Sequence, residues 1–548
     1  MEMTFPWLTA LVVWPLVGAA AVALPGLVRG RRGSAVGAGL AKATALGAAL
    51  VEVVLLAGVF TAFDAGAAAE FQLAETVPWI PQIGASYALA VDGVSLLLVA
   101  LAVVLVPLVL LAAWREQGDN GVALRRFTVL VLILESLMVA VFAARDVFLF
   151  YVLFEAVLIP AYFLIGGFGQ GPERRRAAVK FLMYSLAGGL VMLAAVIALY
   201  FQVPADPATG LRPEDAFLTA NLTGLELDPV VGRLLFVGFF VAFAIKAPMV
   251  PVHTWLPDVA GNATPGTSTL LICVLDKIGT FGMLTLCLPL FPEASRWAAP
   301  LVIGLAVVSV LYGAFAAIGQ TDLLRMIGWT SVSHFGFIIL GIFTFTELGT
   351  AGSAFMMLNH GLATGALFLS AGFLIARHPS RSQVILDYSG LRTVTPVLAG
   401  TFLVAGLATL SLPGLATFVS EIMVLVGAYG DSPGWAIAAI PGVVLAAIYI
   451  LLTYQKIFTG DVADGLDELR DIGPRERLVA APLVAGLLVL GFVPQLALDY
   501  VDAPATQAVA TLETATGGPD AAASADDAAG DGAADETGAE GATAEGND

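Results

Sequence analysis

The chain has 548 residues, of which 59% are hydrophobic and 12% are charged, and its formal net charge is −18. Soluble globular domains carry about 25% charged residues, so this composition excludes a soluble protein. The acidic balance also leaves no basis for nucleic-acid binding, which needs a basic surface.

Apolar segments long enough to cross a bilayer recur along the chain. A transmembrane helix needs about 20 apolar residues. The expected spans are 5–28, 40–63, 91–114, 126–144, 146–168, 177–201, 231–256, 266–290, 297–319, 323–344, 350–376, 394–430, 434–457 and 478–497. We therefore predict an all-α polytopic membrane protein with about fourteen transmembrane helices. The first segment is long and lacks a basic start, so we expect a retained helix and not a cleavable signal.

The basic residues fall unevenly on alternate loops. If the N-terminus lies outside, nineteen Lys and Arg residues fall on the inner side, against only Arg145, Arg212, Arg233 and Arg296 on the outer side. The positive-inside rule then predicts a multi-pass protein of the cell membrane with both termini outside. The acidic excess, with only five lysines in the chain, indicates adaptation to high salt.

Two glutamates lie near the middle of neighbouring spans. Glu155, in FLFYVLFEAVLIP, is about ten residues into its segment, and Glu135, in VLVLILESLMVAVF, has a similar depth one segment earlier. An ionisable residue at this depth costs roughly 2.5–3.5 kcal/mol on insertion scales, so such residues are expected to be functional. Two nearby carboxylates readily share one proton, which makes Glu135 a candidate second station beside Glu155. For each, a protonated glutamate that only joins two helices is the alternative.

Two lysines also lie inside apolar runs. Lys246 precedes Pro248 and Pro251 in AIKAPMVPVHTWLPD, so the helix is expected to break just after it. Broken helices at bilayer depth line polar cavities. Snorkelling to the surface is the alternative, but Lys246 is about ten residues, roughly 15 Å, from the inner end of its helix. Lys277 lies in LLICVLDKIGTFGML beside Asp276, and adjacent helical residues do not face each other.

Histidines and cysteines complete the polar inventory of the spans. His334 (TSVSHFGF) and His360 (MMLNHGLATGALF) are central in their segments. Histidine titrates near neutral pH, which suits a proton shuttle, whereas a neutral ring that holds helices together is the alternative. No third ligand for a metal is evident. Cys273 and Cys287 are fourteen residues apart in one span, which is not a metal or iron–sulfur spacing. We expect no metal or cofactor in this chain.

A second interrupted helix is expected near Glu421. Pro413 and Gly414 split the stretch 394–430, five helices after the break at Lys246. This spacing predicts two inverted five-helix repeats, helices 4–8 and 9–13, with broken helices 7 and 12. The expected organisation is three N-terminal helices (1–125), the first repeat (126–290), the second repeat (297–457), a last helix (478–497) and an acidic disordered tail (502–548).

The motifs AIKAPMVPVHTWLPD, GQTDLLRMIGWTSVSHFGF, NHGLATGALFLSAG and LPGLATFVSEIMVL closely resemble the antiporter-like subunits of respiratory complex I, the NADH–quinone oxidoreductase. The resemblance spans roughly 90–500. Glu421, where sister subunits carry Lys, favours the subunit M branch. The resemblance implies a proton channel in which Glu155 and Lys246 form a coupling pair, Lys277, His334 and His360 form the relay, and Glu421 is the terminal site.

The resemblance also implies partners and an activity. The chain would be a proton-translocating membrane-arm subunit that contacts sister antiporter-like subunits and lipid, while quinone, flavin and iron–sulfur clusters lie elsewhere in the complex. The alternatives are a subunit of a multisubunit cation/proton antiporter and a spacer with a dead channel, which the polar mid-helix residues argue against. The chain departs from the family at Asp276, where an apolar residue is usual, at the loop GNATPGTSTLL, and in its acidic tail.

Overall fold

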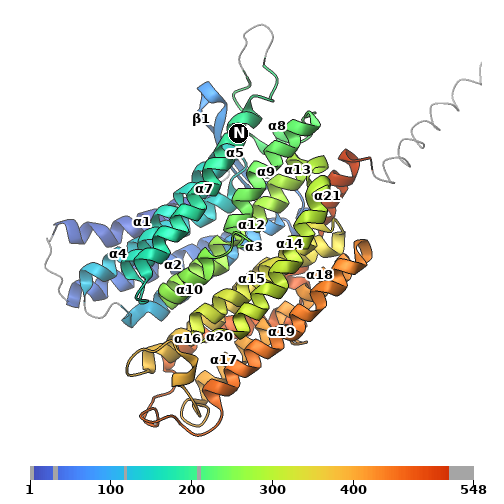
Figure 1. Ribbon diagram of the computed structural model, residues 1–548. Coiled ribbons are helices and arrows are strands. Elements are labelled where there is room, and N and C mark those ends of the chain that lie inside the picture. The colour runs from blue at the N-terminus through green and yellow to red at the C-terminus, as the bar shows by residue number, and fades with distance from the viewer. Residues whose placement is uncertain (1–4, 29–34, 117–119, 206–211, 518–548) are drawn as a thin grey trace, which may run out of the picture.

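The computed structural model describes residues 5–28, 35–116, 120–205 and 212–517. Its helices run side by side and share one tilt in Figure 1. The N-terminal part consists of α1 (Trp7–Val28), α2 (Ala35–Ala62), the strands β1 (Gln72–Ile80) and β2 (Ala85–Val91), and α3 (Gly93–Ala112). One-turn 3₁₀ helices cover 65–67, 81–83, 113–115 and 385–387.

The rest of the described chain is helical. The first predicted repeat contains α4 (Gly121–Ala143), α5 (Val147–Ala156), α6 (Leu158–Phe168), α7 (Arg174–Tyr200), α8 (Thr219–Leu222), α9 (Pro229–Lys246), α10 (Trp255–Asn262), α11 (Pro265–Leu270), α12 (Lys277–Gly282) and α13 (Leu288–Leu290). Then follow α14 (Pro292–Ile318), α15 (Leu323–Phe343), α16 (Glu347–Arg377), α17 (Pro396–Thr409), α18 (Ala416–Asp431), α19 (Pro433–Phe458), α20 (Pro474–Phe492) and α21 (Gln495–Ala515).

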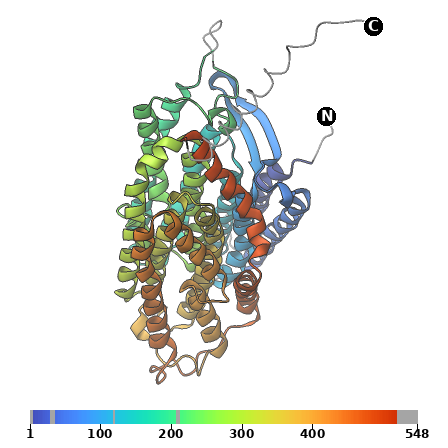
Figure 2. The ribbon, with the colours of Figure 1, turned by 90° about the vertical axis from the view of Figure 1, so that its right-hand side faces the viewer.

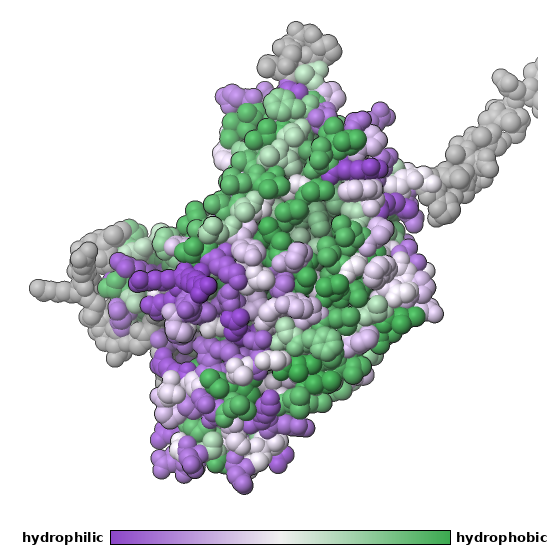
Figure 3. Space-filling view, in the orientation of Figure 1, coloured by the Kyte–Doolittle hydropathy of each residue, from purple (hydrophilic) through white to green (hydrophobic). Residues whose placement is uncertain are grey.

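The prediction of an all-α polytopic membrane protein is confirmed. Twelve helices of the described residues are long and apolar enough to span a membrane, or thirteen when α20 and α21, bent by 66°, count as one broken span. The expected twelfth segment is divided into α17 and α18, which are too short to pass singly. Figure 3 shows hydrophobic residues across the middle of the molecule and hydrophilic residues gathered near the helix ends.

Aspartates at the ends of loops fix where several helices begin. Asp92, Asp146 and Asp322 each accept a hydrogen bond from a backbone N–H in the first turn of α3, α5 and α15. Asp228 does the same for α9. An N-cap of this kind stabilises a helix by about 1 kcal/mol because it satisfies an N–H that has no partner within the helix.

The β1–β2 hairpin was not predicted from the sequence. The strands pair antiparallel, with Val77 opposite Tyr87, and stand at the same end of the molecule as the start of α5 (Figures 1 and 2). Glu75 of β1 accepts hydrogen bonds from the backbone N–H groups of Leu8 and Thr9, so the hairpin anchors the first turn of α1.

The expected disordered tail begins too early. Residues 502–515 continue α21, which packs against α3 and α16. Ala505, Val509 and Leu512 are buried at a spacing of three to four residues, so one face of α21 is apolar and covered. The expectation of disorder is therefore wrong for 502–515, and residues 518–548 lie outside the described part of the chain.

Candidate functional site

The helix that carries Lys246 breaks where the prolines predicted. α9 ends at Lys246 itself, and α10 begins only at Trp255. The indole N–H of Trp255 donates to the carbonyl oxygen of Ile245 (2.9 Å), so a carbonyl next to the break is satisfied inside the protein. The side chain of Lys246 is 1% exposed. Its Nζ donates to the carbonyl oxygen of Phe154 (3.4 Å) and lies 4.4 Å from the centre of the Phe154 ring.

Glu155 follows Phe154 on α5 and is the nearest negative partner of Lys246. The two charges interact through space, and no hydrogen bond joins them in the described part of the chain. Oε1 of Glu155 is buried without a hydrogen-bond partner. It lies against Gly189 of α7, where an added Cβ would stand 1.7 Å from it. The geometry corresponds to a separated form of the expected coupling pair.

Lys277 lies in a distorted helix. π-Helical turns cover Leu271–Leu275 and Met283–Cys287, and Lys277 begins the short α-helical stretch between them. Such turns occur frequently at functional sites. The side chain is fully buried. Its Nζ donates to the carbonyl oxygen of Ile272 (2.9 Å) and lies 2.6 Å from Nδ1 of His360.

The two predicted histidines lie next to each other and extend this chain. Their ring centres are 5.2 Å apart. Nε2 of His334 is 3.0 Å from the carbonyl oxygen of Thr409, so it must be the donor, which leaves Nδ1 of the neutral ring as an acceptor. Nδ1 of His360 accepts from the ammonium of Lys277, so Nε2 of that ring carries the proton. Both remaining nitrogens are buried without a partner in the described residues. The Nε2–H donor of His360 thus complements the Nδ1 acceptor of His334.

Glu421 lies beyond the second break. It is in α18, 4% exposed, close to Ser411 in the break and to Tyr449 of α19. Asn359 of α16 donates to the carbonyl oxygen of Ala416 and to Ser420, which fixes the start of α18 against the helix of His360. The printed contacts thus join Lys277 to His360 and His360 to His334, whereas no direct hydrogen bond joins His334 to Glu421 in the described residues.

Asp276 is a polar residue to which the sequence assigned no role. It is fully buried, and neither carboxyl oxygen has a hydrogen-bond partner in the described residues. It interacts through space with both Lys277 and Lys246. Asp276 is therefore a second acidic neighbour of Lys246, besides Glu155.

Glu135 does not join the site. The carboxyl group that it faces belongs to Glu52 of α2, whereas the charge that Glu155 faces is Lys246. Glu52 was missed, although it lies about twelve residues into the expected span 40–63 and meets the criterion applied to Glu135.

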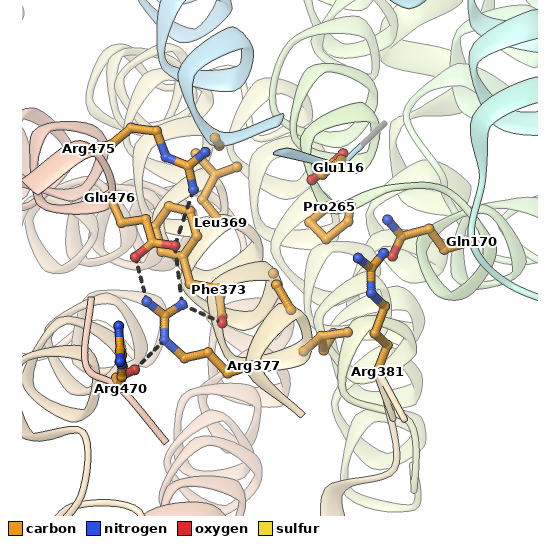
Figure 4. A pocket seen from close by; sticks show the side chains of 14 residues that line it. Glu116, Gln170, Pro265, Leu369, Phe373, Arg377, Arg381, Arg470, Arg475 and Glu476 are labelled. Carbon is orange, nitrogen blue, oxygen red and sulfur yellow. Dashed lines mark hydrogen bonds and ion pairs between the residues drawn. The ribbon is translucent and has the colours of Figure 1, made fainter. Parts of the chain in front are cut away.

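A separate polar pocket lies at the end of α16 (Figure 4). Arg377 donates to both carboxyl oxygens of Glu476, and Arg475 also contacts this carboxylate. Glu116 is on the opposite wall, where burial raises its pKa to about 7 against the opposing effect of Arg381 and Arg475. The cavity holds about 340 Å³, and none of the relay residues lines it.

Within 5–28, 35–116, 120–205 and 212–517, no three His, Cys, Asp or Glu side chains lie close enough to hold a metal ion. Cys273 and Cys287 are both buried as free thiols.

Comparisons with known proteins identify the family of the chain. The sequence matches the family described as "NADH:quinone oxidoreductase/Mrp antiporter, TM" over residues 144–448. It is 47% identical over 540 residues to NADH-quinone oxidoreductase subunit M of Mycobacterium tuberculosis, covering 92% of this chain and 94% of that protein.

Two solved structures match the fold over nearly the whole chain. One is a chain of respiratory complex I from Thermus thermophilus, with 31% identity, a TM-score of 0.81, and 92% of this chain and 99% of that chain covered. The other is a chain of the Mrp complex from Dietzia, with a TM-score of 0.75 over 93% and 100% of the two chains but only 19% identity, which shows the fold alone. The chain belongs to the NADH:quinone oxidoreductase/Mrp antiporter family, on the branch of the complex I subunit M proteins.

Proposed function

We propose that this chain carries protons across the cell membrane as a membrane-arm subunit of a complex I-type quinone oxidoreductase, together with sister antiporter-like subunits. The proton path runs through Glu155, Lys246, Lys277, His360, His334 and Glu421. The flavin, iron–sulfur clusters and quinone act in other subunits. One observation carries the proposal: Lys277 lies 2.6 Å from His360, whose ring lies beside that of His334, in the fully buried centre of the chain.

The first step is a change in the distance between Glu155 and Lys246. At an effective dielectric constant of 20, two unit charges 4 Å apart attract each other by about 4 kcal/mol. Moving one charge against 100 mV costs about 2.3 kcal/mol. Closing the pair therefore holds a proton on Lys246. Opening it, driven by the redox reaction in other subunits, removes this attraction and lowers the proton affinity of Lys246 by more than the cost of moving the charge.

The second step is transfer along the centre. Lys277 gives a proton to Nδ1 of His360, and His360 releases the proton on its Nε2 toward the free Nδ1 of His334. After one transfer each ring carries its proton on Nδ1, so the ring must rotate or move that proton back to Nε2 before it can accept the next one. This reset involves the side chains alone, so the buried helices stay in place.

The third step crosses the break between α17 and α18 to Glu421. His334 is bonded to Thr409, the last residue of α17, and Glu421 faces Ser411 just beyond it. Water bridges of one or two molecules suit such a gap between polar groups. With the termini outside, as the basic residues predict, Glu421 releases the proton to the outer side.

The test is proton uptake by inverted membrane vesicles during quinone reduction, with native protein, Glu155→Gln, and the control Glu347→Gln. Glu347 is an exposed carboxylate in the first turn of α16, outside the path. We expect Glu155→Gln to lower uptake and quinone reduction together by at least tenfold in an assembled complex, and the control to match native protein. Unchanged uptake in Glu155→Gln would refute the proposal and favour a spacer.

A cation/proton antiporter subunit is the second candidate, because the family and the fold include the Mrp complex. The same vesicles distinguish the two. A proton flux driven by a sodium gradient, without quinone reduction, would support the antiporter, whereas a flux that requires quinone reduction supports the complex I assignment.

A further inference from the structure

Glu52 of α2 and Glu135 of α4 form a pair of carboxyl groups inside the membrane domain. Both side chains are 0% exposed. α2 packs against α4, and the two carboxyl groups are each other's neighbouring titratable group. None of their four oxygens accepts a hydrogen bond from another group of the described residues. Two ionised carboxylates have only acceptors, so this contact becomes a hydrogen bond only when one of them carries a proton.

The polar groups around the pair are already used. The indole N–H of Trp14 donates to the carbonyl oxygen of Ala48 (2.9 Å), one turn before Glu52. The hydroxyl of Ser136 donates to the carbonyl oxygen of Val12 (2.6 Å). Both bonds tie α1 to its neighbours at this level, and neither donor is left for the carboxyl groups.

Charged groups that could neutralise the pair are distant or bonded elsewhere. The described parts of α1 and α3 carry no ionisable side chain, and α6 carries only Tyr162. On α2, Lys42 lies ten residues before Glu52, and on α4, Arg126 lies nine residues before Glu135, which is about 14–15 Å along a helix. The neighbouring helices α12 and α5 carry Lys277 and Glu155. Lys277 is bonded to His360, and Glu155 faces Lys246.

Two adjacent carboxylates without donors or counter-charges repel each other by about 4 kcal/mol at 4 Å and an effective dielectric constant of 20. One shared proton removes this repulsion and supplies the missing hydrogen bond. We propose that Glu52 and Glu135 together bind one proton, which makes them a proton-binding site between α2 and α4, separate from the path through Glu155 and Lys246. The inference does not depend on the proposed function, because the pair holds its proton whether or not the relay conducts.

The experiment is an infrared pH titration of the purified assembled complex, which detects protonated carboxyl groups. Native protein is compared with Glu52→Gln, Glu135→Gln and the control Glu75→Gln. We expect each of the first two variants to lose one protonated carboxyl group per complex, because the glutamine amide donates to the remaining carboxylate without a bound proton. The control keeps the native signal, because Glu75 lies outside the pair and accepts two backbone N–H bonds.

Equal infrared signals in native protein and both glutamine variants would overturn the proposal. So would a signal that sodium ions abolish at constant pH, since the pair would then hold a cation. A second measurement needs no variant: a carbodiimide that modifies protonated carboxyl groups in apolar surroundings should label Glu52 or Glu135 in native protein, less so as pH rises. Mass spectrometry identifies the adduct, and absence of an adduct on both residues at every pH would also overturn the proposal.

Discussion

Replacing Gly189 by alanine should displace Glu155 without unfolding the protein. The added Cβ would stand 1.7 Å from Oε1 of Glu155, whereas ordinary contact begins at 3.4 Å, so the carboxyl group must move by about 1.7 Å. The atom that moves is the end of a flexible side chain, and a strained rotamer costs only about 0.5–1.5 kcal/mol. The effect on the charge pair is of similar size. For two unit charges that start about 5 Å apart, a widening of about 1.5 Å at a dielectric constant of 20 loses roughly 0.8 kcal/mol of attraction.

A change of this size alters the balance between the closed and open forms about fourfold. We therefore expect Gly189→Ala to assemble normally and to lower proton uptake by inverted vesicles about fourfold. The matched control is Gly167→Ala on α6, where an added Cβ meets nothing within 4 Å. The double variant Gly189→Ala with Glu155→Asp should regain part of the loss, because the shorter side chain leaves room for the Cβ. Native uptake in Gly189→Ala would refute the role given to the position of Glu155.

Three further predictions follow from single contacts. His360→Gln should lower proton uptake at least tenfold in an assembled complex, because an amide can accept from Lys277 but cannot pass a proton on; vesicle uptake checks this. Trp255→Phe leaves the Ile245 carbonyl without its donor and should cost about 1–3 kcal/mol, measured by thermal unfolding. The Glu116 pKa is raised to about 7, above 4.5, so the folded state binds this proton more tightly and stability should fall as pH rises from about 4.5 to about 7. Glu116→Gln should remove this slope, worth at most roughly 3 kcal/mol, from melting temperatures measured across that range.

The positions of the breaks and of the buried charges could be predicted from the sequence because each has a local cause. Prolines after Lys246 interrupt the helix whatever surrounds it. A charged residue inside an apolar run can be recognised in the sequence without knowledge of the fold. The partners of these charges depend on which helices pack together, and hydropathy does not contain this information. For that reason Glu135 was assigned to Glu155, although the fold pairs it with Glu52.

Local features without a strong composition signal were also missed. The π-helical turns around Lys277 have ordinary apolar sequences, and they arise from packing in a span that is 94% buried. The early part of the acidic tail reads as disordered by composition, but three small apolar residues at helical spacing are enough to dock α21 on the bundle. Tertiary contacts decided both cases, as they commonly do when intrinsic propensity is weak.

Three of the residues on the path share one structural feature that explains why helix breaks and buried charges coincide. Lys246 donates to Phe154 near the end of α5, Lys277 donates to Ile272 in a π-helical turn, and His334 donates to Thr409 at the end of α17. Each acceptor is a main-chain carbonyl at a place where regular α-helical bonding stops. A carbonyl holds a protonated nitrogen in place but cannot take its proton, unlike a carboxylate. The breaks therefore supply fixed acceptors that position each nitrogen and leave the transferred proton free to move to the next titratable group.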